Sequence, residues 1–338
     1  MLKAAVVGVG SMGGNHARVY HNMENVELVA VVDSFEDLAI KIGKRFNVPY
    51  YTSLDKMLEQ CQPDLVSVAV PTSLHFEVCS TLLKRGVNVL VEKPITSHLD
   101  DAEQLIALAK STGLILAVGH IERFNPAVAE LVRQLRTHKI GRVYQINAQR
   151  LSPYPPRIQD VGVVIDLASH DIDLFRYLMD DPIVRVYGET LHSINSTHED
   201  MFSGLLRFQN GAIGVLNVNW MTPAKIRSLT ITGARGMFIC NLLSQELNFY
   251  ENSSNSNEWD SLSILHGVSE GNMTGFSIRR YEPLAAELAD FIEAVSEKRP
   301  PLVRGEDGLE TLRQALEFVK SGESVELIHK VRQTVAQQ

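Results

Sequence analysis

The sequence is poor in the features that mark membrane, disulfide-rich and nucleic-acid-binding proteins. No apolar run approaches the roughly 20 residues that a membrane-spanning helix requires. The chain has only three cysteines, Cys61, Cys79 and Cys240, whose wide spacing matches neither a zinc site nor a disulfide framework. With 32 basic and 40 acidic residues, the net charge of −8 argues against nucleic acid or an anionic membrane as a partner. The N-terminus shows no signal peptide, so we expect a cytoplasmic protein with reduced thiols.

The length of 338 residues indicates two domains, and their boundary is expected where the pattern of predicted strands and helices changes. Residues 1–120 alternate short Val/Leu/Ala-rich runs with amphipathic segments, which predicts a doubly wound parallel sheet. One of these helices is expected to begin with a capping box at Ser97 and Asp100 and to end at Gly113. The strands are expected at Lys3–Gly8, Glu27–Val32, Pro49–Tyr51, Leu65–Val70, Val87–Val91 and Leu114–Val118.

Residues 121–338 are predicted to form a second, α+β domain with a mostly antiparallel sheet that leaves one face open. The proline-rich run Ser152–Pro156 is expected to be a loop, and a helix is expected from Val164 to Met179. Asn210-Gly211 predicts a hairpin turn. Strands are expected at Ile183–Leu191, Met201–Phe208, Ala212–Trp220, Lys225–Thr232 and Arg235–Cys240, and helices near Leu284–Ser296 and Gly308–Ser321.

A glycine-rich motif, Gly8-x-Gly10-x-x-Gly13, lies where the first strand gives way to a helix. Gly8 permits the tight turn, Gly10 lets the backbone approach a pyrophosphate, and Gly13 permits close helix packing. The start of the helix offers N–H groups and a positive dipole to phosphates. Asp33, which ends the second strand, is positioned to accept hydrogen bonds from ribose hydroxyls and to repel a 2′-phosphate. The motif therefore predicts binding of NAD rather than NADP, although a purely structural glycine turn is the alternative.

A lysine follows the fifth predicted strand in Glu92-Lys93-Pro94. Ligands of open α/β sheets bind beyond the carboxyl ends of the strands, so Lys93 is expected near the nicotinamide. Pro71-Thr72 and Gly119-His120 follow two neighbouring strands at the same edge. Desolvation and nearby cations can suit a lysine for acid–base work. Taken alone, Lys93 is better interpreted as a surface lysine in a loop, and the convergence of three strand ends reverses that preference.

Asp166, His170 and Asp173 are spaced i, i+4 and i+7, which predicts that they share one face of a helix. A carboxylate beside an imidazole orients it and raises its basicity, which suits removal of a hydroxyl proton. A surface pair without function is an equal alternative on spacing alone. A metal site is disfavoured because no third ligand has helical spacing. A second polar group, His192, His198, Glu199 and Asp200, is expected to be a solvated loop.

Several arginines have the bidentate geometry that suits phosphate recognition. They are Arg123, Arg150 and Arg157, with Arg279 and Arg280 farther along the chain. Sequence alone does not place their side chains, and ordinary surface charge is the alternative.

Taken together, these motifs resemble the Gfo/Idh/MocA family of nicotinamide-dependent sugar and polyol oxidoreductases over essentially the whole chain. The resemblance is carried by the segments Val7–Gly13, Asp33, Val70–Thr72 with His75, Glu92–Pro94 and Asp166–Asp173. It implies that Lys93, Asp166 and His170 form the catalytic set and that Pro94 is cis. It also implies a homodimer or homotetramer formed through the C-terminal sheet. The implied NAD-binding residues are Gly8, Gly10, Ser11, Met12, Gly13, Asp33, Pro71, Thr72, His75, Glu92 and Lys93.

Within this family, Gly119–Pro126 and Arg150–Gly162 are similar to the UDP-N-acetylglucosamine 3-dehydrogenase group. This similarity implies oxidation of the 3-hydroxyl of a UDP-sugar to a ketone. The implied substrate-binding residues are His120, Arg123, Arg150, Arg157, Asp166 and His170, with no metal. Related members use myo-inositol or free sugars. A cofactor-binding sensor without catalysis is the alternative of another class, although a sensor has no chemical need for an intact Lys93/Asp166/His170 set.

Overall fold

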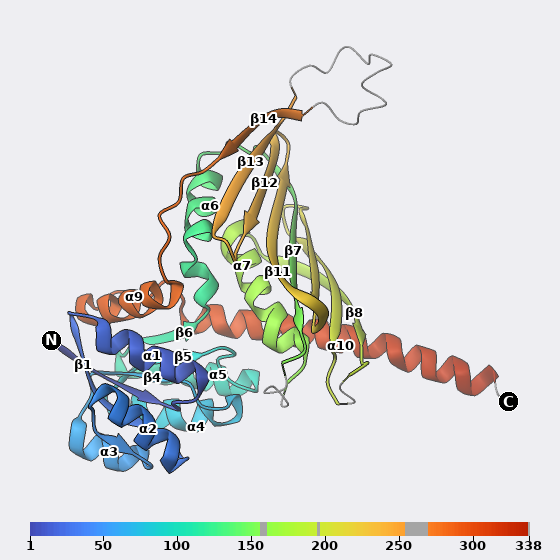
Figure 1. Ribbon diagram of the computed structural model, residues 1–338. Coiled ribbons are helices and arrows are strands. Elements are labelled where there is room, and N and C mark those ends of the chain that lie inside the picture. Colours follow the sequence, from blue (N-terminus) through green and yellow to red (C-terminus); the bar gives the residue numbers. More distant parts are fainter. Residues whose placement is uncertain (156–160, 195–196, 254–269, 337–338) are drawn as a thin grey trace, which may run out of the picture. The chain divides into compact units, whose positions relative to one another are not determined.

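The computed structural model describes residues 1–155, 161–194, 197–253 and 270–336. It divides into two compact units, which are considered separately (Figure 1). The first unit comprises Met1–Phe124 and Glu282–Arg313, and the second comprises Asn125–Tyr281 and Gln314–Gln338. The division differs from two consecutive domains at 1–120 and 121–338, because residues 282–313 pack with the first unit.

The first unit is built on a six-stranded sheet in the order β3-β2-β1-β4-β5-β6. All its neighbouring strands are parallel, which confirms the predicted doubly wound sheet. The central strands are buried on both faces, as their continuous apolar sequences require. The strands are β1 (Leu2–Val7), β2 (Val26–Val32), β3 (Tyr50–Tyr51), β4 (Leu65–Val68), β5 (Asn88–Glu92) and β6 (Leu116–Gly119).

Helices cover the first sheet, and one of them comes from late in the sequence. Leu288 and Phe291 of α9 are buried in the same core as α1 and the sheet. The helices are α1 (Ser11–Asn22), α2 (Glu36–Phe46), α3 (Leu54–Cys61), α4 (His75–Lys84), α5 (Leu99–Thr112) and α9 (Pro283–Glu297), with short 3₁₀ turns η1 (Thr72–Leu74) and η2 (Ile121–Phe124). Gly113 ends α5 in the left-handed conformation, at φ 69°. The predicted capping box is wrong, because His98 precedes the helix and Ser97 lies outside it.

The second unit contains an eight-stranded sheet in the order β14-β13-β12-β11-β7-β10-β9-β8. Only the β7–β10 pair is parallel among the described strands, so the mostly antiparallel prediction is confirmed. Gly211, at φ 91°, forms the predicted hairpin turn between β9 and β10. The strands are β7 (Val143–Pro153), β8 (Ile183–Leu191), β9 (Met201–Phe208), β10 (Ile213–Asn219), β11 (Met221–Gly233), β12 (Gly236–Asn241), β13 (Glu246–Asn252) and β14 (Glu270–Gly275).

One face of this sheet is covered and the other is open. In β9, Phe202 and Leu206 are buried against Phe175 and Phe318, whereas Leu205 points to the other face and is half exposed. The covering helices are α6 (Pro126–Arg136), α7 (Ser169–Met179) and the second part of α10 (Gly305–Ala336), and the turn η3 (Val164–Ala168) precedes α7. Alternation of buried and exposed residues along β9 is the pattern of a sheet covered on one side.

Two features of the second unit differ from expectation. The proline-rich run is not a loop throughout, because β7 continues to Pro153, which pairs with Met221. Proline is accommodated there since it stands at the last position of the strand. Helix α6 and the strands β13 and β14 were not expected from the sequence.

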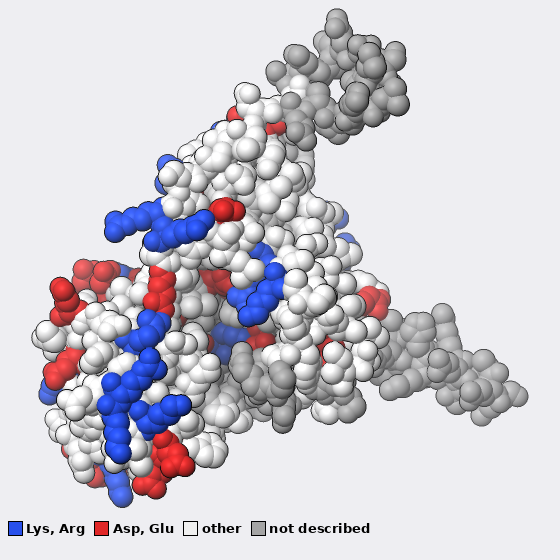
Figure 2. All heavy atoms as spheres, viewed as in Figure 1, with Lys and Arg blue, Asp and Glu red and all other residues white. Residues whose placement is uncertain are grey.

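The surface and the helices agree with the charge and hydropathy of the sequence. Figure 2 shows acidic and basic side chains interspersed on the face in view. Among the helices that the structure describes, none combines the length and apolar character needed to cross a membrane.

Candidate active site

The glycine motif forms a cradle at the start of α1. A Cβ on Gly8 would lie 2.6 Å from the Ala69 carbonyl oxygen, and one on Gly13 would lie 1.7 Å from the Gly8 carbonyl oxygen. A Cβ on Gly10, by contrast, would meet nothing within 4 Å, so this glycine borders open space. Gly10 also supplies no side-chain cap, which leaves the N–H groups at Ser11 and Met12 facing a site for an anion. This cradle fits the pyrophosphate of NAD.

Asp33 follows β2 and is fixed by the backbone around the cradle. Its Oδ2 accepts a hydrogen bond from the Val9 N–H at 2.8 Å, and its Oδ1 accepts one from the Phe35 N–H at 2.9 Å. A carboxylate oxygen has two acceptor positions, so each retains one for a ribose hydroxyl. Asp33 thus couples the cradle to the predicted ribose site.

His75 links the loop that follows β4 to the loop that follows β5. Its Nδ1 lies 2.8 Å from the Pro94 carbonyl oxygen, and its Nε2 lies 3.0 Å from the Val70 carbonyl oxygen. Burial lowers the pKa of His75, although both carbonyl acceptors act in the opposite direction. The ring is buried and holds the two loops, including Pro71 and Thr72, rather than presenting itself to a cofactor.

Lys93 lies at the end of β5, and its neighbours hold its backbone. The Lys93–Pro94 peptide bond is cis, as the resemblance implied. Glu92 Oε2 accepts a hydrogen bond from the Lys93 N–H at 3.3 Å, and Glu92 Oε1 lies 2.9 Å from His16 Nε2. Burial acts to raise the pKa of Glu92, but the hydrogen bond and charge of His16 and the charge of Lys93 outweigh it and lower the pKa. The loop therefore carries an ionised carboxylate beside the candidate catalytic amine.

His120 and Arg123 follow β6, and the structure buries both. The Arg123 guanidinium lies 3.2 Å from the Asp307 carboxylate and donates to the Leu302 carbonyl oxygen at 3.3 Å. Arg123 is thus not an ordinary surface charge, and the partners seen for its guanidinium lie within the first unit, whereas the sequence predicted that it binds a substrate diphosphate. Its contacts tie η2 to the start of α10 within the first unit.

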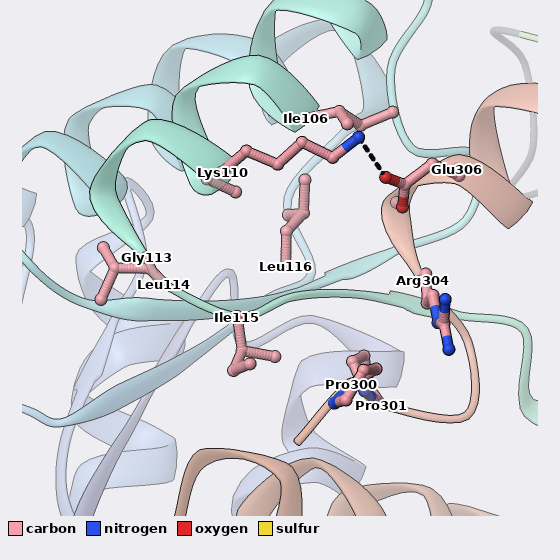
Figure 3. Close-up of a pocket in the computed structure, with 12 residues that line it drawn as sticks. Ile106, Lys110, Gly113, Leu114, Ile115, Leu116, Pro300, Pro301, Arg304 and Glu306 are labelled. Carbon is pink, nitrogen blue, oxygen red and sulfur yellow. Dashed lines mark ion pairs between the residues drawn. The ribbon is translucent and has the colours of Figure 1, made fainter. Parts of the chain in front are cut away.

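A cavity in the first unit lies at the opposite end of β6. It has a volume of about 270 Å³ and is bordered by Leu116, Pro300 and the ion pair between Lys110 and Glu306, whose charged atoms are 2.7 Å apart (Figure 3). Ligands of such sheets bind at the carboxyl ends of the strands. The cavity adjoins the amino end of β6, so we do not assign the cofactor to it.

In the second unit, Asp166 and His170 lie where the helix begins, and both are half-buried. The predicted helix from Val164 to Met179 is present, but its first turn is a π-helix, in which the Ser169 N–H donates to the Val164 carbonyl oxygen. Asp173 is buried, so it does not share the exposure of the other two. The assumption of regular α-helical spacing was therefore wrong here, and π turns are frequent at functional sites.

Of the polar group His192, His198, Glu199 and Asp200, the two acidic residues are buried rather than solvated, and Glu199 anchors this turn. Glu199 Oε1 accepts a hydrogen bond from the Val164 N–H at 3.0 Å, and the Glu199 carbonyl oxygen accepts one from the Val163 N–H at 3.0 Å. Asp200 Oδ2 accepts hydrogen bonds from the N–H groups of Ser193 and Ile194. Both acidic side chains are buried, since these backbone donors replace water as their partners.

Arg150 is buried and forms a bidentate ion pair with Asp171. Its Nε and one terminal nitrogen each lie 2.9 Å from an oxygen of Asp171. The arginine therefore stabilises the link between β7 and α7. The sequence had predicted instead that its guanidinium binds a substrate diphosphate. Arg157 lies outside the described residues.

Comparison with known proteins agrees with this construction. Residues 2–120 match the model of the Gfo/Idh/MocA oxidoreductase family with an NAD-binding Rossmann fold, and residues 128–239 match the model of the C-terminal domain of the same family. The chain belongs to the Gfo/Idh/MocA family. It is an oxidoreductase with an NAD-binding Rossmann fold, so the predicted cofactor and enzyme class are confirmed.

Individual relatives cover nearly the whole chain. UDP-N-acetylglucosamine 3-dehydrogenase of Acidithiobacillus ferrooxidans is 28% identical over 94% of this chain and 96% of its own. A solved structure of that enzyme superposes with a TM-score of 0.85, covering 96% of this chain and 98% of its own. Myo-inositol 2-dehydrogenase of Thermotoga maritima is 25% identical over 91% of this chain and 92% of its own. A protein from gentamicin A biosynthesis solved in complex with NAD is 25% identical, with a TM-score of 0.80, and covers 95% of this chain and 94% of its own.

Sequence reasoning missed two buried groups that lie near these loops, namely His16 and Glu287, and it expected Glu199 to be solvated. His16 follows Gly13 by three residues, and a histidine on the sheet-facing side of the nucleotide-binding helix was a usable signal. Glu287 carried no signal, and the partner of Glu199 could not be predicted because Val164 is 35 residues away in the sequence.

Proposed function

We propose that the protein oxidises a secondary hydroxyl of a sugar, and that its substrate is UDP-N-acetylglucosamine or a related UDP-sugar, oxidised at the 3-hydroxyl. The observation that carries this proposal is the similarity to UDP-N-acetylglucosamine 3-dehydrogenase over 94% of the chain, combined with an intact Lys93, Asp166 and His170. The arginines do not carry it, because Arg123 and Arg150 are engaged within their own units.

In the proposed mechanism, His170 is the general base that removes the proton of the reacting hydroxyl. Asp166 orients the imidazole, and Lys93 donates a hydrogen bond to the reacting oxygen. General-base assistance of this kind accelerates a reaction about 10²–10⁴-fold. NAD, when bound, supplies the acceptor for the hydride that leaves the sugar carbon. The Gly8–Gly13 cradle and Asp33 would hold its pyrophosphate and ribose.

The first experiment is a turnover assay with NAD, in which UDP-N-acetylglucosamine, UDP-N-acetylglucosaminuronate and myo-inositol are each tested separately as the substrate. Formation of NADH, followed by its absorbance, is expected with a UDP-sugar and is expected to be lost in Lys93→Ala. Turnover of myo-inositol alone would favour the second candidate function, which the 25% identity to a myo-inositol 2-dehydrogenase supports. Calorimetric binding of NAD with no turnover of any sugar would instead indicate a sensor.

We also propose that the open face of the second sheet joins copies of the chain into a homodimer or homotetramer in the cytoplasm. Tyr187 and Leu205 are paired across β8 and β9, and each is about half exposed, at 47% and 50%. Exposed apolar patches of this kind mark interaction surfaces. Sedimentation of a Leu205→Asp variant is expected to show a smaller assembly than the parent chain, and an unchanged assembly would contradict the proposal.

A further inference from the structure

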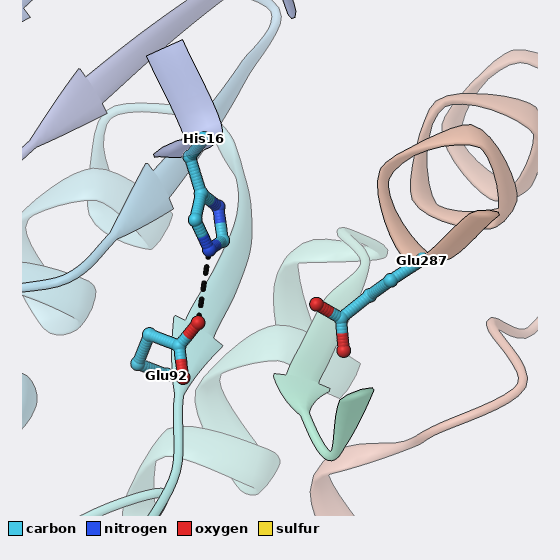
Figure 4. Close-up of side chains that lie close together, drawn as sticks. All are labelled: His16, Glu92 and Glu287. Atoms are coloured by element: carbon cyan, nitrogen blue, oxygen red, sulfur yellow. Dashed lines mark hydrogen bonds and ion pairs between the residues drawn. The ribbon is translucent and has the colours of Figure 1, made fainter. Parts of the chain in front are cut away.

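Three ionisable side chains gather behind the Lys93 loop, all of them within the first unit. His16 comes from α1, Glu92 from the end of β5 and Glu287 from α9, and one ligand-type atom of each lies within 4.8 Å of the others. His16 and Glu287 are 0% and 2% exposed, and the Glu92 side chain is 13% exposed. Figure 4 shows the Glu287 carboxylate turned toward the His16–Glu92 pair.

This acid–base cluster, defined as His16, Glu92 and Glu287, is connected to the candidate catalytic lysine by a continuous set of contacts. His16 Nε2 lies 2.9 Å from Glu92 Oε1, and Glu92 Oε2 accepts the Lys93 N–H at 3.3 Å. Gly119, which pairs with Glu92 across β5 and β6, leaves room for the carboxylate, since a Cβ there would lie 3.0 Å from Oε2. The helix that begins at the cofactor cradle is thereby linked to the loop that carries Lys93.

The charges explain why this contact differs from an ordinary packing contact. Burying two carboxylates beside one imidazole carries a large desolvation cost for the charged forms, so the charge of each member depends on the charges of the other two. The charged and titratable groups that face Glu92 are His16 from α1, Lys93 from its own loop, Glu287 from α9 and His75 from α4, and Tyr20 of α1 faces Glu287. A change in the protonation of Glu92 alters the charge next to Lys93.

We propose that His16 and Glu92 are positioning residues, which hold the Lys93 loop and set the charge beside its amine during the reaction. The proposal rests on the proposed function, because it assigns these residues a role in the chemistry of Lys93. Without His16, Glu92 is free to turn from the Lys93 N–H, and the amine no longer has a fixed position. A displacement of about 1 Å in such a group costs as much as 10²-fold in rate.

The first test compares His16→Ala with His16→Gln over a range of pH. His16→Ala is expected to lower kcat about tenfold or more and to move the pH profile of kcat/KM, with little change in the KM for NAD. His16→Gln places an amide N–H near the position of Nε2 and is expected to restore most of kcat, but not the original pH profile.

The control is Tyr20→Phe, which removes another buried hydrogen bond of α1, that between Tyr20 and Ser67 at 2.8 Å. It is expected to lower stability while leaving kcat and the pH profile unchanged. A folded His16→Ala with the kcat and pH profile of the parent chain would overturn the proposal. An equal change of both quantities in Tyr20→Phe would also overturn it, because the effect would then be structural.

A second readout needs no substrate and separates this proposal from the proposed function. Acylation of Lys93 by an amine-selective reagent is measured by mass spectrometry, relative to the exposed Lys41 on α2. Glu92→Gln is expected to raise Lys93 labelling about two- to tenfold, since an ammonium without a neighbouring carboxylate loses its proton more readily. Unchanged labelling would refute the charge-setting role even in an active enzyme. A clear increase in a chain that oxidises no sugar would support the cluster and reject the proposed function.

Discussion

Each unit buries one ion pair next to a candidate catalytic residue, and the two pairs differ in chemistry. In the first unit, the His16–Glu92 pair lies next to Lys93, and the carboxylate of Glu92 can take up a proton at acidic pH. In the second unit, Asp171 follows His170 in α7 and pairs with Arg150 of β7, and the arginine stays charged at all accessible pH values.

The difference indicates that the two units support their catalytic residues in different ways. The bidentate Arg150–Asp171 pair is a fixed link between β7 and α7. Its geometry does not depend on pH through the arginine, because the arginine keeps its proton. The His16–Glu92 pair is a single hydrogen bond whose strength depends on where the protons are. The first unit is therefore expected to be the pH-sensitive half of the enzyme.

The largest expected effect comes from removing the candidate catalytic groups themselves. Lys93→Ala and His170→Ala are each expected to lower kcat about 10²–10⁴-fold, since each removes a group that stabilises or accepts the transferred proton. Calorimetry should show that both variants retain NAD affinity. Near-normal turnover in both variants would contradict the proposed catalytic roles of Lys93 and His170.

Breaking the Arg150–Asp171 pair of the second unit is expected to lower the free energy of unfolding more than breaking the His16–Glu92 pair of the first unit. Arg150→Met removes the cation that pairs with the buried Asp171 carboxylate, and a loss of about 3–5 kcal/mol in the free energy of unfolding is expected from urea denaturation. Arg133→Met on α6 is the matched control, because its pair with Glu130 is exposed, and little change is expected. If Arg150→Met and the control were equally stable, the buried Arg150–Asp171 pair would not stabilise the contact between β7 and α7.

Loosening the π turn is expected to have an intermediate effect. Glu199→Gln replaces a charged acceptor of the Val164 N–H, and a loss of about 1.5–3 kcal/mol in unfolding free energy is expected. Asp181→Asn serves as the comparison, because Asp181 accepts the Asn210 N–H at 2.9 Å at an exposed position. The account of the turn fails if the two variants lose the same stability.

The pH sensitivity of the first unit has a definite sign. The pKa of Glu92 is lowered from 4.5 in the folded protein, so its ionised form contributes stability that is present above this value and is lost as the pH falls below it. The stability advantage of the parent chain over Glu92→Gln is therefore expected to stay constant from neutral pH down to this value and to shrink as the pH is lowered below it. Thermal unfolding at several pH values measures this difference, and a constant or growing advantage at low pH would have the wrong sign.

The smallest expected effect concerns the choice of cofactor. Asp33→Ala removes the carboxylate that repels a 2′-phosphate, and the preference of kcat/KM for NAD over NADP is expected to fall about tenfold, or 1.4 kcal/mol. Asp37→Ala, in the first turn of α2, provides a control at an exposed position. Unchanged selectivity in Asp33→Ala would mean that another group reads the ribose.

The first unit was more predictable from the sequence than the second, for a physical reason. Its glycine cradle, Asp33 and Lys93 stand at strand ends, and parallel topology alone brings strand ends to one edge. In the second unit, the helix is preceded by a π turn whose Val164 N–H is held by Glu199, and the role of Arg150 depends on its pairing with Asp171. Spacing along the chain carries no information on such long-range partners, so these arginine and carboxylate roles needed coordinates.

The central claim is that Lys93 and His170 serve the same proton transfer. A double-mutant cycle of Lys93→Ala and His170→Ala on kcat/KM for the sugar substrate tests it most directly. Because residues that act on one step are not additive, the double variant is expected to be little slower than the slower single variant. Two single effects that multiply in the double variant would show that the residues act independently, and the shared catalytic role would be contradicted.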